Sequence, residues 1–412
     1  MNFFKTCYRK EIIMEYEKYM TLRSKPLKAS GIREMFKLMA DPAVISLAGG
    51  SPDPELFPTD FLADIASEIL KTNGKKALAY GTTDGYAPLK ELLIERTKQI
   101  SSFSDNDKII ITTGAQQAID LAARVVVEDN DCIVVESPSF VGTLNSLRSV
   151  RAKLTGVKME ADGMDMAALE DVLKNNNVKL IYTIPNFQNP TGITMSLEKR
   201  RKLLELAAKY DCLILEDNPY GDLRFAGESV PTIKSLDTEG RVIYVGSLSK
   251  ILSPGLRIGY IVCGAELCDK IEIVKQVNDV HTPCLTQMMA AEFLKRYDVS
   301  AHIKKACEVY GRKCRFMISC MEKYFPESVT WTKPEGGLFI LVYCPEAIDA
   351  AALSLEAVQK YKVAFVPCNN FETDMDAKTS SFRLNYSTMP ESKIKEGIKA
   401  IGTLLADKLG KE

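Results

Sequence analysis

Seven short apolar runs constrain the fold of this 412-residue chain more than any other feature. They are rich in Val and Ile and mostly lack polar alternation, which is typical of strands buried on both faces of a sheet. Stretches with helical spacing, such as "AQQAIDLAARVVVE", lie between them. The sequence therefore predicts an α/β fold, a seven-stranded sheet with helices on both faces. The predicted strands span residues 109–113, 132–136, 153–157, 179–185, 212–217, 242–246 and 258–263.

The connection between the last two predicted strands is shorter than the others. Residues 247–257 contain Ser253, Pro254 and Gly255, which interrupt a helix. A crossover to a parallel neighbour takes a dozen or more residues, usually with a helix. We therefore expect the strand at 258–263 to run antiparallel to the strand before it, so that the sheet is mixed.

The last third of the chain has a different pattern. A helical stretch at about 298–325 precedes three strand-like runs, "GGLFILVYC", "VAFVPC" and "SFRLNYS", which indicate a smaller α+β domain. A chain of this length is long for one core, so two domains are expected. We predict a large domain at 46–285, a small domain at 286–412, and an N-terminal segment at 1–45 that packs on the small domain or on a partner subunit.

Composition excludes several classes of function. A net charge of −1 gives no support for binding nucleic acid or an anionic membrane surface. No run approaches the ~18 apolar residues of a membrane span, and charges interrupt the N-terminal region, so we expect a cytoplasmic protein. Eleven scattered cysteines without a C-x-x-C motif fit a reducing compartment. Because His281 and His302 are the only histidines, catalysis by histidine or a histidine metal site is not expected.

A lysine closes one of the apolar runs, in "VIYVGSLSKILSPGLRIGYIVC". Burial disfavours a charged amine, so Lys250 has two interpretations on this stretch alone. It could extend to a loop surface with its amine in water. It could instead be a nucleophile whose pKa is lowered by its surroundings.

Other polar groups follow the predicted strands, where ligands collect in an open α/β sheet. Each has a simple structural explanation: a strand–helix turn at Gly114, a cap at Asp217, a turn in "NFQNPTG", a core aromatic at Phe140. Together they match pyridoxal phosphate, which has a phosphate, a flat ring, a basic ring nitrogen, a phenolic oxygen and an aldehyde. The candidate groups are the anion site (Ala115, Gln116, Ser247, Ser249, Arg257), the ring face (Phe140), the carboxylate (Asp217), the hydrogen-bonding pair (Asn189, Tyr220) and Lys250.

The chain resembles the fold-type I pyridoxal-phosphate aminotransferases of class I/II over nearly all its length. The resemblance rests on "VISLAGGSPDPELFP", "AYGTTDGYAPLKELL", "ITTGAQQAIDL", "PNFQNPTG", "EDNPYGDLRF", "GSLSKILSPGLRIGY", "PEGGLFI" and "FRLNYS". It is strongest for the branch that acts on 2-aminoadipate, kynurenine and aromatic amino acids. Phe140 departs from the family, which often has tyrosine there.

The resemblance implies a role for each residue. Lys250 binds the cofactor aldehyde covalently and then moves the substrate Cα proton. Asp217 keeps the ring nitrogen protonated, Asn189 and Tyr220 bond the phenolic oxygen, and Arg383 binds the substrate α-carboxylate with help from Asn189 and the backbone of Gly49. Tyr80 reaches the phosphate from a partner subunit, which implies a homodimer with shared active sites.

The implied reaction transfers the amino group of an L-amino acid to 2-oxoglutarate by a ping-pong mechanism. The expected donors are 2-aminoadipate, aromatic or long aliphatic amino acids. The segment around "SKPLKASGIREMF" is expected to act as a lid, and Arg23, Lys25 or Arg33 could meet a distal carboxylate. A C–S β-lyase on the same scaffold stays open as an alternative. An aminotransferase-like regulator is disfavoured because fewer than 50 residues precede the matching region.

Overall fold

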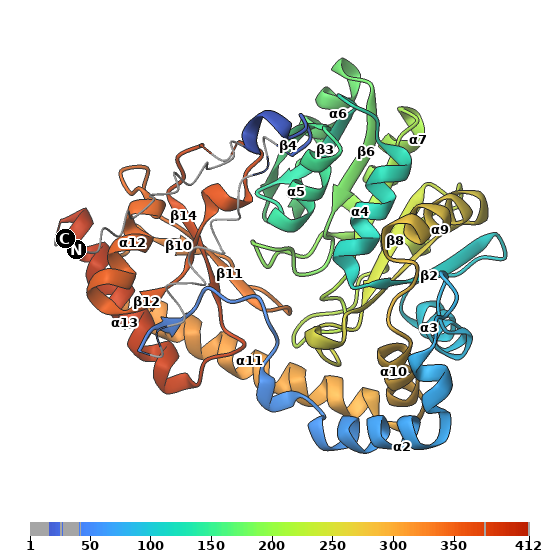
Figure 1. Ribbon diagram of the computed structural model, residues 1–412. Helices are drawn as coiled ribbons and strands as arrows, with labels where there is room; N and C mark the ends of the chain where they lie inside the picture. The colour runs from blue at the N-terminus through green and yellow to red at the C-terminus, as the bar shows by residue number, and fades with distance from the viewer. Residues whose placement is uncertain (1–15, 25–26, 28–40, 42, 375, 411–412) are drawn as a thin grey trace, which may run out of the picture.

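A mixed eight-stranded sheet forms the centre of the larger part of the molecule (Figure 1). The computed structural model describes residues 16–24, 27, 41, 43–374 and 376–410. The strand order is β2-β9-β8-β7-β6-β3-β4-β5. The bounds are β2 Asp107–Thr113, β3 Cys132–Ser137, β4 Lys153–Glu160, β5 Gly163–Met164, β6 Val178–Thr183, β7 Leu213–Asp217, β8 Val242–Ser247 and β9 Ile258–Gly264.

All seven strands predicted from the sequence are present. β9 runs antiparallel to β8 on one side and to β2 on the other, which confirms the mixed sheet. β5 is an eighth strand of two residues, paired antiparallel with the end of β4. A two-residue strand has no periodicity, so no pattern in the sequence indicated it.

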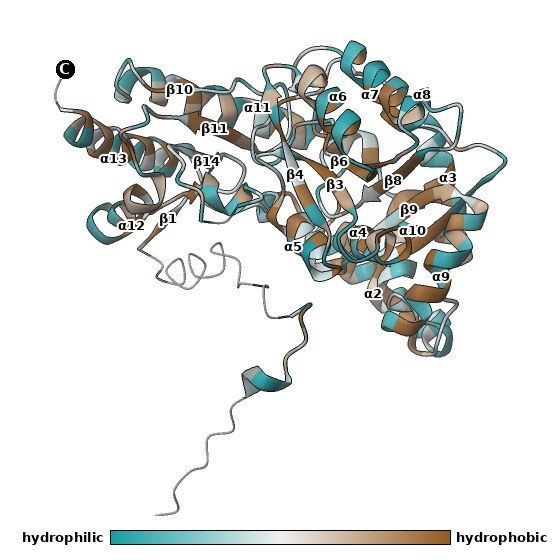
Figure 2. Ribbon diagram, turned by 90° about the horizontal axis from the view of Figure 1, so that it is seen from above, coloured by the Kyte–Doolittle hydropathy of each residue, from teal (hydrophilic) through white to brown (hydrophobic). Residues whose placement is uncertain are grey.

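Alternate residues of the parallel strands lie in two different cores. Ile133 and Val135 of β3 belong to one hydrophobic cluster, while Cys132 and Val134 belong to another on the opposite face. Both clusters are covered by helices, so nearly every position of β3, β7 and β8 is buried, whereas β4 nearer the edge of the sheet is largely exposed or half-buried. This explains the continuous apolar runs, and Figure 2 shows these strands as brown ribbons inside the molecule.

Helices cover both faces of this sheet. α4 lies against α5 and α9, and α6 lies against α7. Of the periodic residues of α4, Ala118, Ile119, Ala122 and Val126 are buried, and Ala115 at the start of the helix is partly buried. The bounds are α2 Thr59–Leu78, α3 Ala87–Ile100, α4 Ala115–Val126, α5 Val141–Ser149, α6 Met166–Asn175, α7 Leu197–Lys209, α8 Ile233–Leu236, α9 Ala265–Asp279 and α10 Cys284–Arg296, with single 3₁₀ turns at Tyr16–Tyr19, Pro54–Leu56 and Pro254–Leu256.

A smaller antiparallel sheet forms the second part of the molecule, with strand order β10-β11-β14-β13. The long helix α11 packs against α13 and extends across the molecule to α2 in Figure 1. It confirms the helix expected at about 298–325. The bounds are α11 Val299–Tyr324, β10 Thr330–Trp331, β11 Phe339–Tyr343, α12 Ala350–Tyr361, β12 Val363–Ala364, β13 Val366–Pro367, a 3₁₀ turn at Cys368–Phe371, β14 Ser381–Asn385 and α13 Glu391–Leu409.

The predicted strand "VAFVPC" is divided at Phe365 because the chain changes its pairing partner there. β12 pairs in parallel with β1 (Ile45–Ser46), whereas β13 pairs with β14. An early segment, at Ile45–Ser46, is thus joined to the C-terminal part of the chain. The division into domains at 46–285 and 286–412 stays our proposal, and most of the segment 1–45 lies outside the described residues. Over the part of the chain that the structure describes, no helix is long and apolar enough to cross a membrane.

Candidate active site

A pocket of about 380 Å³ lies at the carboxyl ends of the parallel strands. Two loops form one wall, the loop after β6 and the loop after β7, and the segment after β8 forms the floor. Segments from the two ends of the chain close it. The lining residues are Ala48, Gly50, Ser51, Ala115, Gln116, Phe140, Ile184, Asn189, Asp217, Pro219, Tyr220, Ser247, Ser249, Lys250, Pro254, Arg257 and Arg383.

Lys250 points into this pocket rather than to a loop surface. Its Nζ donates a hydrogen bond of 2.6 Å to the carbonyl of Gly50 and lies 5.8 Å from the ring centroid of Tyr220. Burial lowers the pKa of Lys250 to about 8, assisted by the positive charges of Arg383 and Arg257. The neutral form of this amine, which a nucleophile or a general base requires, is therefore far more populated near neutral pH than in a free lysine.

Asp217 is the last residue of β7 and is almost fully buried. Its Oδ2 accepts a hydrogen bond of 2.8 Å from the hydroxyl of Tyr182, while its Oδ1 has no hydrogen-bond partner. Burial raises the pKa of this carboxyl to about 7, against the opposing effects of Tyr182 and Lys250. An unpartnered buried carboxylate oxygen needs an explanation, and a protonated ring nitrogen would satisfy it.

One end of the pocket is concave and positively charged. Gly114 precedes α4 with φ 80° and ψ 165°, so that the backbone N–H groups of Ala115 and Gln116 begin the helix. A Cβ at Gly114 would overlap the guanidinium of Arg257. Ser247 and Ser249 lie on the same side, where the backbone N–H of Ser249 donates to Ser247 Oγ at 3.1 Å. Hydroxyls, helix N–H groups and a guanidinium around a space of this shape suit a phosphate group.

The opposite end of the pocket is built around Arg383 of β14. Its Nη1 donates a hydrogen bond of 2.8 Å to Asn189 Oδ1, and its Nη2 donates to the carbonyl of Ala48 at 2.7 Å. The guanidinium lies 4.2 Å from the ring centroid of Phe339 and 5.0 Å from that of Phe371. Burial lowers its pKa to about 10, so it stays charged at neutral pH. Its Nε has no hydrogen-bond partner, which leaves a donor for a carboxylate.

Two of the predicted residues do not line the pocket. Gly49 is adjacent to it, with its carbonyl 3.5 Å from Arg383 Nη2. Tyr80 lies outside, 88% exposed, with its ring edge-on to His281 at 5.7 Å. Of the three basic residues suggested for a distal carboxylate, Arg23 forms an ion pair of 3.6 Å with Asp129, away from the pocket. Lys25 and Arg33 lie outside the described residues.

Sequence reasoning missed several residues that shape the pocket. Tyr182 is the main omission, because a tyrosine in the apolar run "KLIYTIP" looks like a core residue. Gly50 ends the motif "VISLAGG" and Ser51 follows it, but no local pattern indicates that they approach Lys250. Asn189 and Tyr220 were predicted, and the structure places the Nδ2 of Asn189 3.4 Å from the Tyr220 hydroxyl.

These groups fit pyridoxal phosphate. The anion end suits its phosphate, the free oxygen of Asp217 its ring nitrogen, and the amine of Lys250 its aldehyde. The fold and the pocket thus define a pyridoxal-phosphate enzyme of the transferase type. The chain belongs to the aminotransferase class I and II family, whose family model matches residues 44–401.

Similar proteins agree with this assignment. The chain is 42% identical to aromatic-amino-acid aminotransferase 1 of Thermococcus litoralis, covering 97% of this chain and 96% of the relative. It resembles the structure of Pyrococcus horikoshii kynurenine aminotransferase in complex with PMP, with a TM-score of 0.92, 39% identity and coverage of 96% and 98%. It also resembles LysN, the α-aminoadipate aminotransferase of Thermus thermophilus complexed with N-(5'-phosphopyridoxyl)-L-leucine, with a TM-score of 0.89, 34% identity and coverage of 96% and 99%. The protein is a pyridoxal-phosphate-dependent transaminase, and these three relatives are named as aromatic-amino-acid, kynurenine and α-aminoadipate aminotransferases.

Proposed function

We propose that this enzyme transfers the amino group of an L-amino acid to 2-oxoglutarate, and that it accepts 2-aminoadipate, aromatic and long aliphatic donors. The observation that carries the proposal is that Lys250 and Arg383 line the same small pocket. Arg383 would bind the α-carboxylate, and that contact would bring the Cα atom toward Lys250. Pyridoxal phosphate, when bound, supplies the aldehyde that takes up the amino group and a ring that withdraws electrons from Cα.

Lys250 is proposed to move the Cα proton. Its lowered pKa supports this role, because the neutral amine can accept the proton and return it at a different carbon. Asp217 would stay ionised beside the positively charged ring nitrogen, since an opposite charge lowers the pKa of a buried carboxyl. The hydroxyl of Tyr182 leaves only one oxygen of Asp217 for that contact.

Orientation would come from both ends of the pocket. Ser247, Ser249, Arg257 and the first N–H groups of α4 would hold the phosphate, while Phe140 would lie against the ring. Asn189 and Tyr220 would bond the phenolic oxygen. Because Asn189 also accepts the bond from Arg383, the same side chain would link the ring to the substrate carboxylate.

The pocket has one arginine for an α-carboxylate, so we propose that the donor and the acceptor bind in turn. This is the ping-pong mechanism. Among the described lining residues, the only cations are Lys250, Arg257 and Arg383. None is left for a side-chain carboxylate, which supports a pocket that does not select for one charged side chain. The names of the similar proteins, which include aromatic, kynurenine and α-aminoadipate aminotransferases, also support a broad range.

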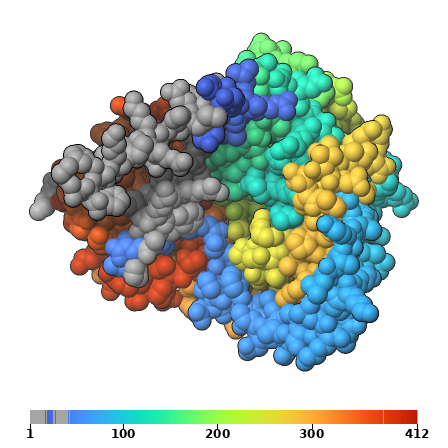
Figure 3. Space-filling model, in the orientation of Figure 1, coloured from blue at the N-terminus to red at the C-terminus, as the bar shows by residue number. Residues whose placement is uncertain are grey.

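We further propose a homodimer with two shared active sites. Large apolar side chains are exposed near the end of α2 and on α9: Leu78 at 74%, Tyr80 at 88% and Val277 at 86%. Tyr80 and His281 connect these two regions. Such a surface is typical of a contact between subunits. The chain around α2 forms one rim of the face shown in Figure 3.

A cytoplasmic location stays a prediction, supported by the ten described cysteines, which are all unpaired.

The test is a panel of amino donors with 2-oxoglutarate as the acceptor, following glutamate formation. We expect kcat/KM values for 2-aminoadipate, leucine and phenylalanine to exceed those for alanine and aspartate. Lys250→Ala is the matched negative control. Activity confined to alanine or aspartate would contradict the proposed donor range, and product formation without any keto acid acceptor would indicate a lyase.

A further inference from the structure

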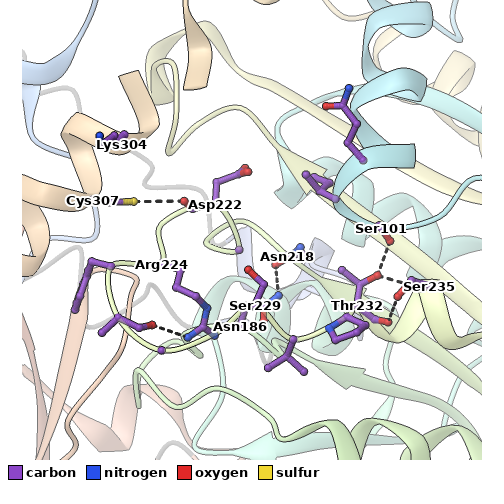
Figure 4. Close-up of a pocket in the computed structure, with 18 of the residues that line it drawn as sticks. Ser101, Asn186, Asn218, Asp222, Arg224, Ser229, Thr232, Ser235, Lys304 and Cys307 are labelled. Atoms are coloured by element: carbon purple, nitrogen blue, oxygen red, sulfur yellow. Dashed lines mark hydrogen bonds between the residues drawn. The ribbon is translucent and has the colours of Figure 1, made fainter. Parts of the chain in front are cut away.

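A second, larger cavity of about 980 Å³ lies behind the wall of the candidate active site (Figure 4). The same two loops separate the two spaces. In the first loop, Asn189 lines the active-site pocket and Asn186 lines the larger cavity. At the second loop, Asp217 at the end of β7 and Tyr220 line the pocket, whereas Asn218 between them lines the cavity. Residues a few positions apart therefore face two different spaces.

A row of hydrogen bonds runs along the cavity side of this wall. Arg200 of α7 donates a bond of 2.7 Å to Asn186 Oδ1, and Asn186 Nδ2 donates one of 2.8 Å to Asn218 Oδ1. Asn218 Nδ2 then donates to the hydroxyl of Tyr244 in β8 at 3.1 Å. The row fixes the loop after β6, the loop after β7 and the strand before Lys250 relative to one another.

The start of the row is rigid. Arg200 is fully buried, and its guanidinium donates to the carbonyls of Met195, Pro231 and Pro185, besides Asn186. A buried cation whose donors are engaged on several sides has little freedom to move, so it gives the loops a fixed point.

Several polar groups of the cavity are engaged with the protein itself. Ser101 and Thr232 share a hydrogen bond of 2.5 Å, and Cys307 donates to the carbonyl of Asp222 at 3.5 Å. Arg224 forms an ion pair of 2.6 Å with Glu335. Figure 4 shows the Asn186–Asn218 bond at the centre of these contacts. These contacts indicate a structural support for the wall.

We propose that Asn186 and Asn218 are positioning residues for the groups that hold the cofactor ring. On the pocket side, the contact between the two loops is the bond of 3.4 Å from Asn189 to Tyr220. The bond of 2.8 Å between Asn186 and Asn218 is shorter and joins the same loops from behind. It sets the separation of Asn189 from Tyr220 and the placement of Asp217, the neighbour of Asn218. This inference rests on the proposed function, because it assigns the ring contacts to those three residues.

The test compares Asn186→Ala, Asn218→Ala and the double variant. Each single change should lower kcat by about 10- to 100-fold, because a displacement of the order of 1 Å can cost 10²-fold. Both single changes break the bond between Asn186 and Asn218, and each also breaks one further bond, from Arg200 or to Tyr244. The double variant should therefore lose clearly less than the product of the two single losses. Ser229→Ala is the control: Ser229 lines the same cavity, is exposed and takes no part in the row.

Two further measurements separate positioning from loss of stability. The pH midpoint of the visible absorption of the bound cofactor should shift in both alanine variants, and the Kd for pyridoxal phosphate should rise. KM for the amino acid should change less than kcat, because Arg383 keeps its bonds to Ala48. A lower Tm with an unchanged midpoint and an unchanged kcat would overturn the proposal.

A final variant covers the case in which the alanine variants do not fold. Tyr244→Phe removes only the hydroxyl at the end of the row, and we expect a smaller shift of the midpoint in the same direction. No shift there would overturn the proposal. Wild-type transamination is measured in parallel: if the wild type is inactive, the proposed function fails, whereas an active wild type with unaffected variants refutes only the positioning role.

Discussion

Gly114 and Arg257 are so close that a Cβ at position 114 would overlap the Arg257 guanidinium. They are joined across the β2–β9 pair, where Arg257 Nη2 also donates a bond of 3.2 Å to the carbonyl of Thr113. The glycine therefore does two things: it adopts φ 80° at the start of α4 and it leaves the space that Arg257 occupies.

We predict that Gly114→Ala displaces Arg257 and raises the Kd for pyridoxal phosphate at least tenfold, because a charge-assisted bond to the phosphate is lost. Titration of the apoenzyme of each variant with pyridoxal phosphate measures this Kd. Gly240→Ala is the matched control, since Gly240 also has a positive φ of 76° but a Cβ there would meet nothing within 4 Å. An equal Kd in the two variants would contradict the steric argument.

Arg257 itself has a left-handed backbone, with φ 56° and ψ 50°. This conformation costs an ordinary residue roughly 1–2 kcal/mol, but not glycine. We predict that the apoenzyme of Arg257→Gly is more stable than that of Arg257→Ala by about 1 kcal/mol, although both lose affinity for the phosphate. Urea unfolding of the two apoenzymes provides the comparison. Equal midpoints would show that the strain is relieved elsewhere.

The amine of Lys250 should react with the cofactor in its neutral form. Since burial lowers its pKa to about 8, the rate at which pyridoxal phosphate joins the apoenzyme should rise with pH around a midpoint near 8. A free lysine would give a midpoint of the rate at about pH 10.4. Stopped-flow absorbance measures the rate, and borohydride reduction followed by peptide mapping should find the label on Lys250. A label on another lysine would refute the assignment.

Asp217 is expected to reduce the stability of the apoenzyme while enabling its chemistry. Its folded pKa is raised from 3.8 to about 7, so between these values the native state holds a proton that the unfolded state has released. The contribution of Asp217 to the free energy of unfolding is therefore fully present below about pH 4 and is lost as the pH rises to about 7. We predict that apo Asp217→Asn gains stability over the wild type at about pH 8 but not at about pH 4, and loses most activity. Urea unfolding at both pH values is the measurement, and a constant difference between them would contradict the prediction.

The shared site can be tested by mixing two inactive variants. Tyr80→Ala and Lys250→Ala should each be inactive, but a hybrid dimer regains one site with both residues. Random exchange of subunits should restore about a quarter of the wild-type activity. Sedimentation of the active species should give a dimer. A fully active monomer would rule out the composite site.

The sheet could be predicted because each buried strand is a short apolar run that is visible in the local sequence. The runs at β3, β6, β7 and β8 are apolar over most of their length since both faces are covered, and that leaves a clear mark in the sequence. The direction of β9 followed from the length of one connection. β5 and the divided strand at Phe365 were not predictable, because they depend on which neighbour the backbone meets.

The site was predictable where residues follow a strand and hidden where distant segments meet. Asp217 and Lys250 end or follow apolar runs, so their place at one edge of the sheet could be inferred. The approach of Ala48 and Gly50 depends on the pairing of β1 with β12, which no local pattern shows. Asn186 and Asn218 look like ordinary turn residues in the sequence, and only the row of bonds through them in the structure distinguishes them.

The short connection between β8 and β9 has a consequence for the synthesis of the chain. Once residues up to Gly264 have left the ribosome, the chain already contains Lys250, Arg257 and the segments that pair beside them. Arg383 emerges much later, and it must meet Ala48, from which 335 residues separate it. The residues that would hold the cofactor are thus all synthesised by the time Gly264 is added. The half of the pocket that would bind an amino acid is completed only when the later segment with Arg383 packs against the earlier segment with Ala48.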